Sequence, residues 1–147
     1  MGSQEPRFDA FKLAARGGEL AGAIDPARLP RCGEQVAAEG GSVAWRIRGG
    51  DDGQGRPALT VSLAGEVPVT CQRCLGTLRQ RVAQETVLLL ARDEAELRRL
   101  DEASECEVVL ASAPVDAVEL VEDELLLSLP FAPRHEQDCG ADAAARD

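Results

Sequence analysis

Residues 59–76, LTVSLAGEVPVTCQRCLG, lead from an alternating run into a pair of cysteines. Hydrophobic side chains hold most of the odd positions from Leu59 to Val69, whereas Thr, Ser and Glu hold most of the even ones. A period of two predicts a strand with one buried face. Residues 78–91 are rich in Val and Leu and contain no Gly or Pro, so they predict a second strand. We therefore expect the fold to centre on two strands joined at the cysteines.

The cysteine pair, Cys71 and Cys74, has the spacing of a metal-binding knuckle, in which Gly76 permits a tight turn. Two further soft ligands, His135 and Cys139, lie near the C-terminus, and the four together match the spacings of structural zinc sites. Closing this loop costs on the order of 4 kcal/mol of chain entropy, which zinc binding of ~10–16 kcal/mol more than offsets. We therefore predict zinc at these four residues. The alternative is that the thiols are apolar packing residues and the histidine is a surface side chain.

A thiol redox function is the alternative to zinc binding for a Cys-x-x-Cys motif. In such proteins the first thiol lies at a helix N-terminus, where the helix dipole lowers its pKa. Gly76 and the strand-like residues from Leu78 onward do not fit that context, so this reading is the weaker one. The chain has a single His, no Gly-rich phosphate loop and no H-E-x-x-H motif. We therefore expect a protein that is not an enzyme and has no small-molecule substrate.

The remaining patterns predict a single α+β domain. Alternation predicts strands near residues 20–24 and 43–47, and residues 107–111 predict a further short one. We expect an antiparallel sheet or partly open barrel of about five strands, a usual sheet size, with one main C-terminal helix packed on it. The domain is expected to span residues 18–140, between a flexible N-terminal segment at 1–17 and a flexible tail at 141–147.

The main helix is predicted at residues 116–129. Asp116 and Glu119 form a capping box, and Pro130 ends the helix. One apolar stripe should face the sheet; it consists of Val118, Val121, Leu125 and Leu129. Four acids are expected on the opposite, solvated side: Glu119, Glu122, Asp123 and Glu124.

Charge is distributed unevenly along the chain. Residues 1–100 carry 14 Lys and Arg against 13 Asp and Glu, whereas residues 101–147 carry 2 against 13, a balance of −11. Such an acidic region repels nucleic-acid phosphates and attracts basic proteins. We interpret the four helix acids as a partner-binding face. The alternative is that they only keep the fold soluble.

The order of strands, cysteine pair, acidic helix and C-terminal ligands resembles the YceD family. The matching motifs are Cys71-Gln-Arg-Cys74-Leu75 and residues 121–130, VEDELLLSLP, followed by Pro133, His135 and Cys139. The likeness extends over about residues 18–140. It implies a ribosome-biogenesis factor, not an enzyme, that supports accumulation of large-subunit (23S) ribosomal RNA. The partner we expect is a basic ribosomal protein or a large-subunit assembly intermediate.

Direct contact with ribosomal RNA is the alternative mode of action. Five cations can form a basic strip across neighbouring strands: Arg46, Arg48, Arg73, Arg79 and Arg81. Proteins that bind single-stranded RNA place aromatic side chains beside basic ones. This chain has no Tyr, and Trp45 is the one aromatic residue beside these arginines. No signal peptide is visible, and no apolar run approaches the ~20 residues that span a bilayer. We therefore expect a cytoplasmic protein without a membrane partner.

Overall fold

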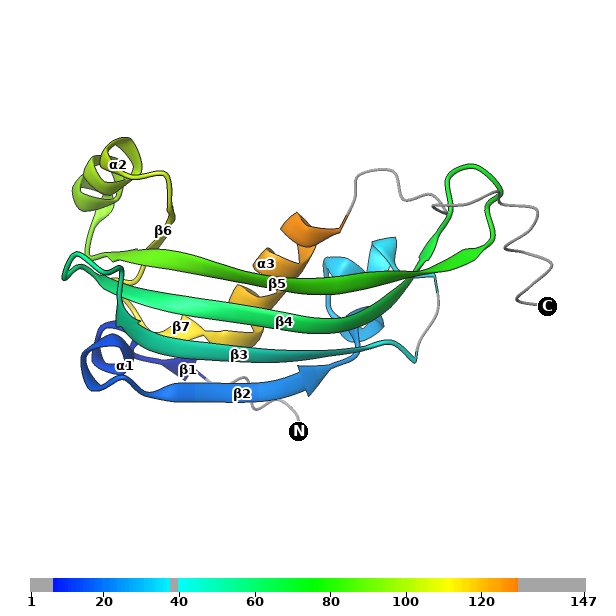
Figure 1. The fold of residues 1–147 in the computed structure, drawn as a ribbon, viewed down its shortest axis with the longest axis horizontal. Helices are drawn as coiled ribbons and strands as arrows, with labels where there is room; N and C mark the ends of the chain where they lie inside the picture. Colours follow the sequence, from blue (N-terminus) through cyan, green and yellow to red (C-terminus); the bar gives the residue numbers. More distant parts are fainter. Residues whose placement is uncertain (1–6, 38–39, 130–147) are drawn as a thin grey trace.

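The computed structural model describes residues 7–37 and 40–129. Its centre is a five-stranded sheet in the order β2-β3-β4-β5-β6, with a two-stranded ribbon of β1 and β7 beside it (Figure 1). The strands are β1 (Arg7–Phe8), β2 (Glu19–Ile24), β3 (Ser42–Asp51), β4 (Pro57–Thr70), β5 (Thr77–Ala91), β6 (Glu107–Leu110) and β7 (Val115–Asp116). The helices are α1 (Ala10–Arg16), α2 (Glu94–Ala103) and α3 (Ala117–Ser128), with two 3-10 turns, η1 (Pro26–Arg28) and η2 (Cys32–Gln35). The predicted α+β class and the number of sheet strands are confirmed.

Strand β4 supplies the middle of the core, as its alternation predicts. Leu59 is fully buried and Val61 and Leu63 are 1% and 2% exposed, whereas the intervening Thr60 and Ser62 are only half-buried. Its neighbour β3 alternates in the same way, with Val43, Trp45 and Ile47 on the buried side. One face of the sheet therefore packs inward, and the other carries the small and charged residues.

The sheet is mixed and open, which corrects the prediction of an antiparallel sheet or partly open barrel. The pairs β2–β3, β3–β4 and β4–β5 are antiparallel, but β6 lies parallel to β5, with Leu88 opposite Glu107 and Ala91 opposite Leu110. A parallel return requires a crossover of a dozen residues or more, and residues 92–106, which contain α2, supply it. In the described residues β2 and β6 form the two edges, so the sheet does not close.

Residues 10–16, predicted as part of a flexible segment over 1–17, form helix α1 instead. The Asp9 carboxylate accepts from the N–H of Lys12 at 3.1 Å and so caps the helix. Leu13 is 1% exposed in the main core. The backbone of α1 approaches β3 closely at Gly49, where a Cβ atom would lie 2.1 Å from the Leu13 carbonyl oxygen. Residues 1–6 lie outside the described part of the chain, as does the predicted tail at 141–147.

Helix α3 lies across the inner face of the sheet (Figure 1). The Asp116 carboxylate accepts from the N–H groups of Val118 and Glu119 at 2.9 and 3.1 Å, which confirms the predicted cap. Val121 and Leu125 of the predicted stripe are fully buried. Within the described residues no helix combines the length and the apolar character needed to cross a membrane.

Candidate partner-binding groove

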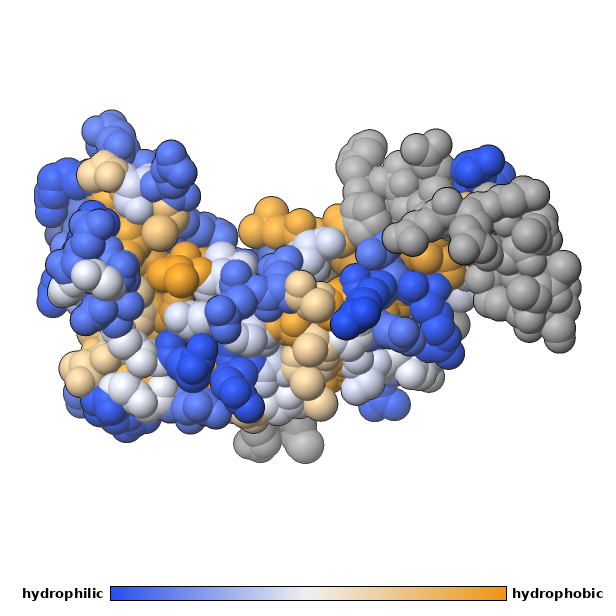
Figure 2. All heavy atoms as spheres, viewed as in Figure 1, coloured by the Kyte–Doolittle hydropathy of each residue, from blue (hydrophilic) through white to orange (hydrophobic). Residues whose placement is uncertain are grey.

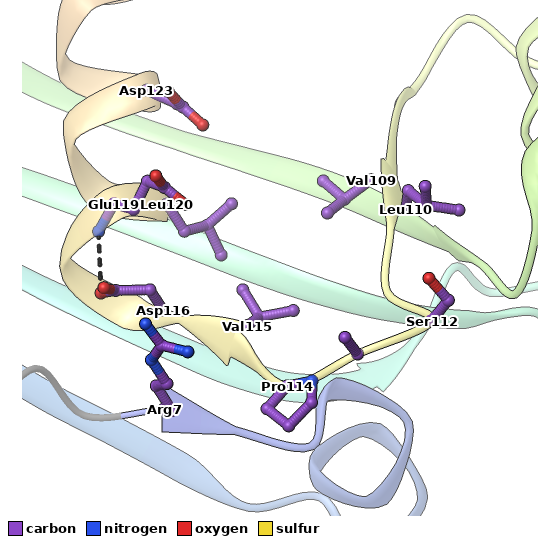
Figure 3. Close-up of a pocket in the computed structure, with 11 residues that line it drawn as sticks. Arg7, Val109, Leu110, Ser112, Pro114, Val115, Asp116, Glu119, Leu120 and Asp123 are labelled. Atoms are coloured by element: carbon purple, nitrogen blue, oxygen red, sulfur yellow. Dashed lines mark hydrogen bonds between the residues drawn. The ribbon is translucent and has the colours of Figure 1, made fainter.

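A groove of about 400 Å³ runs between α3 and the edge strand β6. Figure 3 shows Leu120 of α3 and Val109 of β6 pointing toward one another across it, with Val115 between them. Three carboxylates and one guanidinium occur in its lining, which consists of Arg7, Val109, Leu110, Ser112, Ala113, Pro114, Val115, Asp116, Glu119, Leu120 and Asp123. We call this the α3/β6 groove; it is apolar between its walls and acidic along α3.

The surface near this groove exposes apolar side chains. Figure 2 shows apolar atoms gathered where the molecule is hollowed between α2 and α3. Leu127 of α3 is 68% exposed and Leu110 of β6 is 41% exposed. Exposed apolar residues rimmed by polar ones mark interaction sites more often than plain surface. The sequence alone did not indicate Val109 or Leu110, because their place beside α3 depends on the parallel return of β6.

The four predicted acids do not share one solvated face. Glu119 is exposed and Asp123 is half-buried, and both line the groove. Glu122 and Glu124 are 3% and 2% exposed, so the prediction that they lie on the solvated side is wrong. The helix is buried on more than one side, because both η2 and the sheet pack against it.

Glu122 binds the start of η2. Its Oε2 accepts from the N–H groups of Arg31 and Cys32 at 2.6 and 2.8 Å, and its Oε1 accepts from Arg31 Nε at 3.4 Å. Arg31 Nη2 also contacts Asp123 Oδ1 at 2.6 Å, and this bond raises the pKa of the Arg31 guanidinium. Burial, followed by the charge of Glu122, raises the pKa of the Cys32 thiol to about 12. Glu122 is therefore an anchor between α3 and η2, and Cys32 is a protonated core residue.

Glu124 lies on the side of α3 that faces β5 and β6. Burial, and then the nearby Glu107 carboxyl group of β6, raises the pKa of Glu124 to about 7. The hydroxyl of Thr86 in β5 hydrogen-bonds the same carboxyl group and lowers its pKa in part. One oxygen, Oε2, is buried without a hydrogen-bond partner in the described residues. Burial and a like charge nearby therefore both favour the protonated form of Glu124.

The cysteine turn has the backbone of a knuckle. The N–H of Cys71 donates to the Gly76 carbonyl and the N–H of Leu75 donates to the Cys71 carbonyl, both at 2.8 Å. Leu75 adopts a positive φ of 62°, and the Gly76 N–H donates to Cys74 Sγ at 3.4 Å. Cys71 is fully buried and Cys74 is exposed.

The other two predicted zinc ligands, His135 and Cys139, lie outside the described residues. Within 7–37 and 40–129, no three His, Cys, Asp or Glu side chains gather as a metal site. The motif connects strands β4 and β5 directly, so neither thiol lies at a helix N-terminus. This is not the context that activates redox thiols.

The predicted basic strip lies on the outer face of the sheet, where acids are interspersed with it. Arg46 contacts Glu19 at 3.2 Å, Arg48 contacts Glu85 at 3.4 Å, and Arg79 contacts Glu66 at 3.6 Å. Arg81 lies opposite Glu66 in the β4–β5 register, and Arg73 is in the exposed cysteine turn. The structure therefore brings four of the five arginines onto one face, but with three neutralising carboxylates among them.

A known protein family matches more than half of the chain. The model described as "Large ribosomal RNA subunit accumulation protein YceD" matches residues 59–146. The match begins in β4 and includes the cysteine turn, β6 and α3. No solved structure matches the chain.

Proposed function

Since the chain belongs to the YceD family, we propose that it supports the accumulation of large-subunit (23S) ribosomal RNA without being an enzyme, by binding a basic ribosomal protein or assembly intermediate in the cytoplasm. The family name supplies the ribosomal role. The acidic α3/β6 groove indicates a basic partner, and it is the observation that carries this proposal.

The charge of the groove favours a basic protein. All lining residues except Arg7 come from residues 109–123, which contain four acids and no Lys or Arg. Glu119 is exposed on the groove wall, and Asp116 and Asp123 lie in line with it along α3. Exposed charges of one sign speed the encounter with a partner of the opposite sign. Val109 and Val115, which are half-buried in the groove lining, add the apolar contact that charge alone does not provide.

Partner capture from a lysate at two salt concentrations tests this proposal. The Debye length falls from ~30 Å at 0.01 M to ~8 Å at 0.15 M, so capture by the wild-type chain should weaken with salt. Glu119→Lys should reduce capture of ribosomal proteins at both concentrations. Glu102→Lys is the matched control, because Glu102 is an exposed acid of α2 that does not line the groove. If both variants capture as much ribosomal protein as the wild type, the groove is not the contact.

The same experiment separates protein contact from RNA contact. A chain that binds RNA through its outer face should lose binding when Arg46 and Arg48 are replaced by Gln, and should lose part of its salt dependence. Reversing Glu119 should then leave binding unchanged or strengthen it. We expect the opposite pattern for both sets of variants.

A further inference from the structure

Strand β6 has an open outer edge in the part of the chain that the structure describes. The Ala111 N–H donates to the Ala91 carbonyl at 2.9 Å, so the backbone of Ala111 faces β5. Successive residues of a strand direct their backbone groups to alternate sides. The backbone of Val109 therefore also faces β5, whereas the N–H and C=O groups of Val108 and Leu110 face away from the sheet. Such an edge is a template for a further strand.

The α3/β6 groove lies directly beside this edge. Val109 and Glu107 direct their side chains to the inner face of the sheet, because they lie opposite the inward-facing Leu90 and Leu88. Helix α3 presents Leu120 to the same space (Figure 3). An edge strand next to a helix-walled apolar groove is the arrangement in which peptides bind by strand addition, with backbone bonds to the edge and side chains in the groove.

The charge near each edge of the sheet determines which kind of peptide segment is favoured there. The groove beside β6 is lined by Asp116, Glu119 and Asp123 against Arg7; Arg31, outside the lining, pairs with Asp123, so Glu119 is the exposed charge. At the opposite edge, β2 pairs with the part of β3 that carries Arg46 and Arg48, and Glu19 and Glu85 balance these two arginines. A basic segment is therefore favoured at β6 and an acidic one is not.

We propose that a basic, extended segment of the protein partner adds to β6 as an outer strand. It places an apolar side chain between Val109 and Leu120, and a Lys or Arg side chain meets Glu119. This inference rests on the proposed function and names the form in which the partner is bound.

A labelled peptide tests the backbone pairing. The probe is fluorescein-labelled Lys-Thr-Val-Thr-Lys-Thr-Val-Thr-Lys, which places Lys and Val on one face of a strand and Thr on the other. Fluorescence anisotropy should show binding to the wild-type chain. Two further probes carry N-methyl groups at the Thr residues or at the Val and Lys residues, and each blocks one edge of the peptide. Strand addition predicts that one of them binds like the parent peptide and the other binds about tenfold or more weakly.

Substitutions in β6 and α3 test the place of binding. Leu110→Pro removes an N–H that β5 does not use, so it should lower peptide affinity about tenfold or more while the thermal melt shows a folded domain. Leu110→Ala is the matched control, because it keeps the N–H and should retain more of the affinity. Glu119→Lys should weaken binding of all three peptides.

Three results would overturn the strand addition. If the two N-methylated probes bind equally, the peptide is held by charge and side chains without a strand pair. If Leu110→Pro binds like Leu110→Ala, the β6 edge is not used. If sedimentation shows a wild-type dimer that Leu110→Pro converts to a monomer, the occupant of the edge is a second copy of the chain. In each case the proposed function stands if Glu119→Lys still reduces capture of ribosomal proteins, and it fails separately if that variant has no effect.

Discussion

Glu124 is a carboxyl group enclosed between a helix and the edge of the sheet. It is 2% exposed, and Oε2 has no hydrogen-bond partner among the described residues. A charged carboxylate in such a place is costly, whereas a protonated one is tolerated. Burial and the neighbouring Glu107 therefore keep the proton on Glu124 to higher pH than on an ordinary Glu.

Replacing Glu124 by Gln should change how stability depends on pH. The pKa of Glu124 is raised from 4.5 to about 7 in the folded chain, so the folded state holds a proton that the unfolded state releases between these values. The free energy of unfolding should therefore fall as pH rises from 4.5 to 7, by a few kcal/mol at most, since one pKa unit corresponds to about 1.4 kcal/mol.

Urea unfolding at several pH values measures this dependence. Glu124→Gln should give a flatter profile over that range and greater stability than the wild type above it. Glu107→Gln should flatten the profile in part, because it removes the second cause of the raised pKa. Parallel profiles for the wild type and Glu124→Gln would contradict a buried Glu124 with a raised pKa.

The cysteine turn leads to a separate prediction about zinc. Its backbone bonds and the positive φ of Leu75 are compatible with a knuckle, and binding by Cys71, Cys74, His135 and Cys139 stays a prediction. Native mass spectrometry of protein purified without a polyhistidine tag should find about one zinc per chain. Cys71→Ser should lose the metal, and Cys106→Ser should keep it. A wild-type chain that binds no zinc when the metal is supplied would contradict the four-ligand site.

Helix α3 contributes to stability through one side and is exposed to solvent on another. Val121 and Leu125 are fully buried against the sheet, whereas Leu127 is 68% exposed on the same helix. Val121→Asp should bury an unpaired charge at a cost of several kcal/mol, a large part of the ~5–15 kcal/mol that stabilises a typical domain.

Circular dichroism melting compares this variant with a matched control. Val121→Asp should lose the cooperative transition or shift it to a much lower temperature. Leu127→Asp places the same charge at an exposed position and should change stability by about 0.5 kcal/mol or less. If the two variants melt alike, α3 does not pack as described.

The strands and caps that depend on local patterns could be predicted from the sequence. The alternation from Leu59 to Val69 fixes which face of β4 is buried, and Asp116 caps α3 through its own local hydrogen bonds. The direction of β6 could not be predicted, because it depends on how residues 92–106 cross over. The burial of Glu122 likewise depends on η2, which lies about ninety residues earlier in the chain.

The arrangement of the whole molecule explains why the acidic part of the chain is not simply a solvated surface. Two of the four helix acids are used inside the fold, Glu122 with η2 and Glu124 with the sheet. The acids that remain accessible line the α3/β6 groove together with apolar side chains. On the other face of the sheet, arginines and glutamates alternate and partly neutralise one another. The groove is therefore a surface of the described residues where charge and apolar contact coincide.

The ratio of large-subunit to small-subunit ribosomal RNA, measured in a strain that lacks its own copy of the gene, tests the central claim most directly. The strain is complemented in turn with the wild type, Glu119→Lys and Glu102→Lys, each shown by immunoblotting to be present at equal level. We predict that the wild type and Glu102→Lys restore the ratio and that Glu119→Lys does not. Full restoration by Glu119→Lys would contradict the claim that this protein acts through the acidic α3/β6 groove.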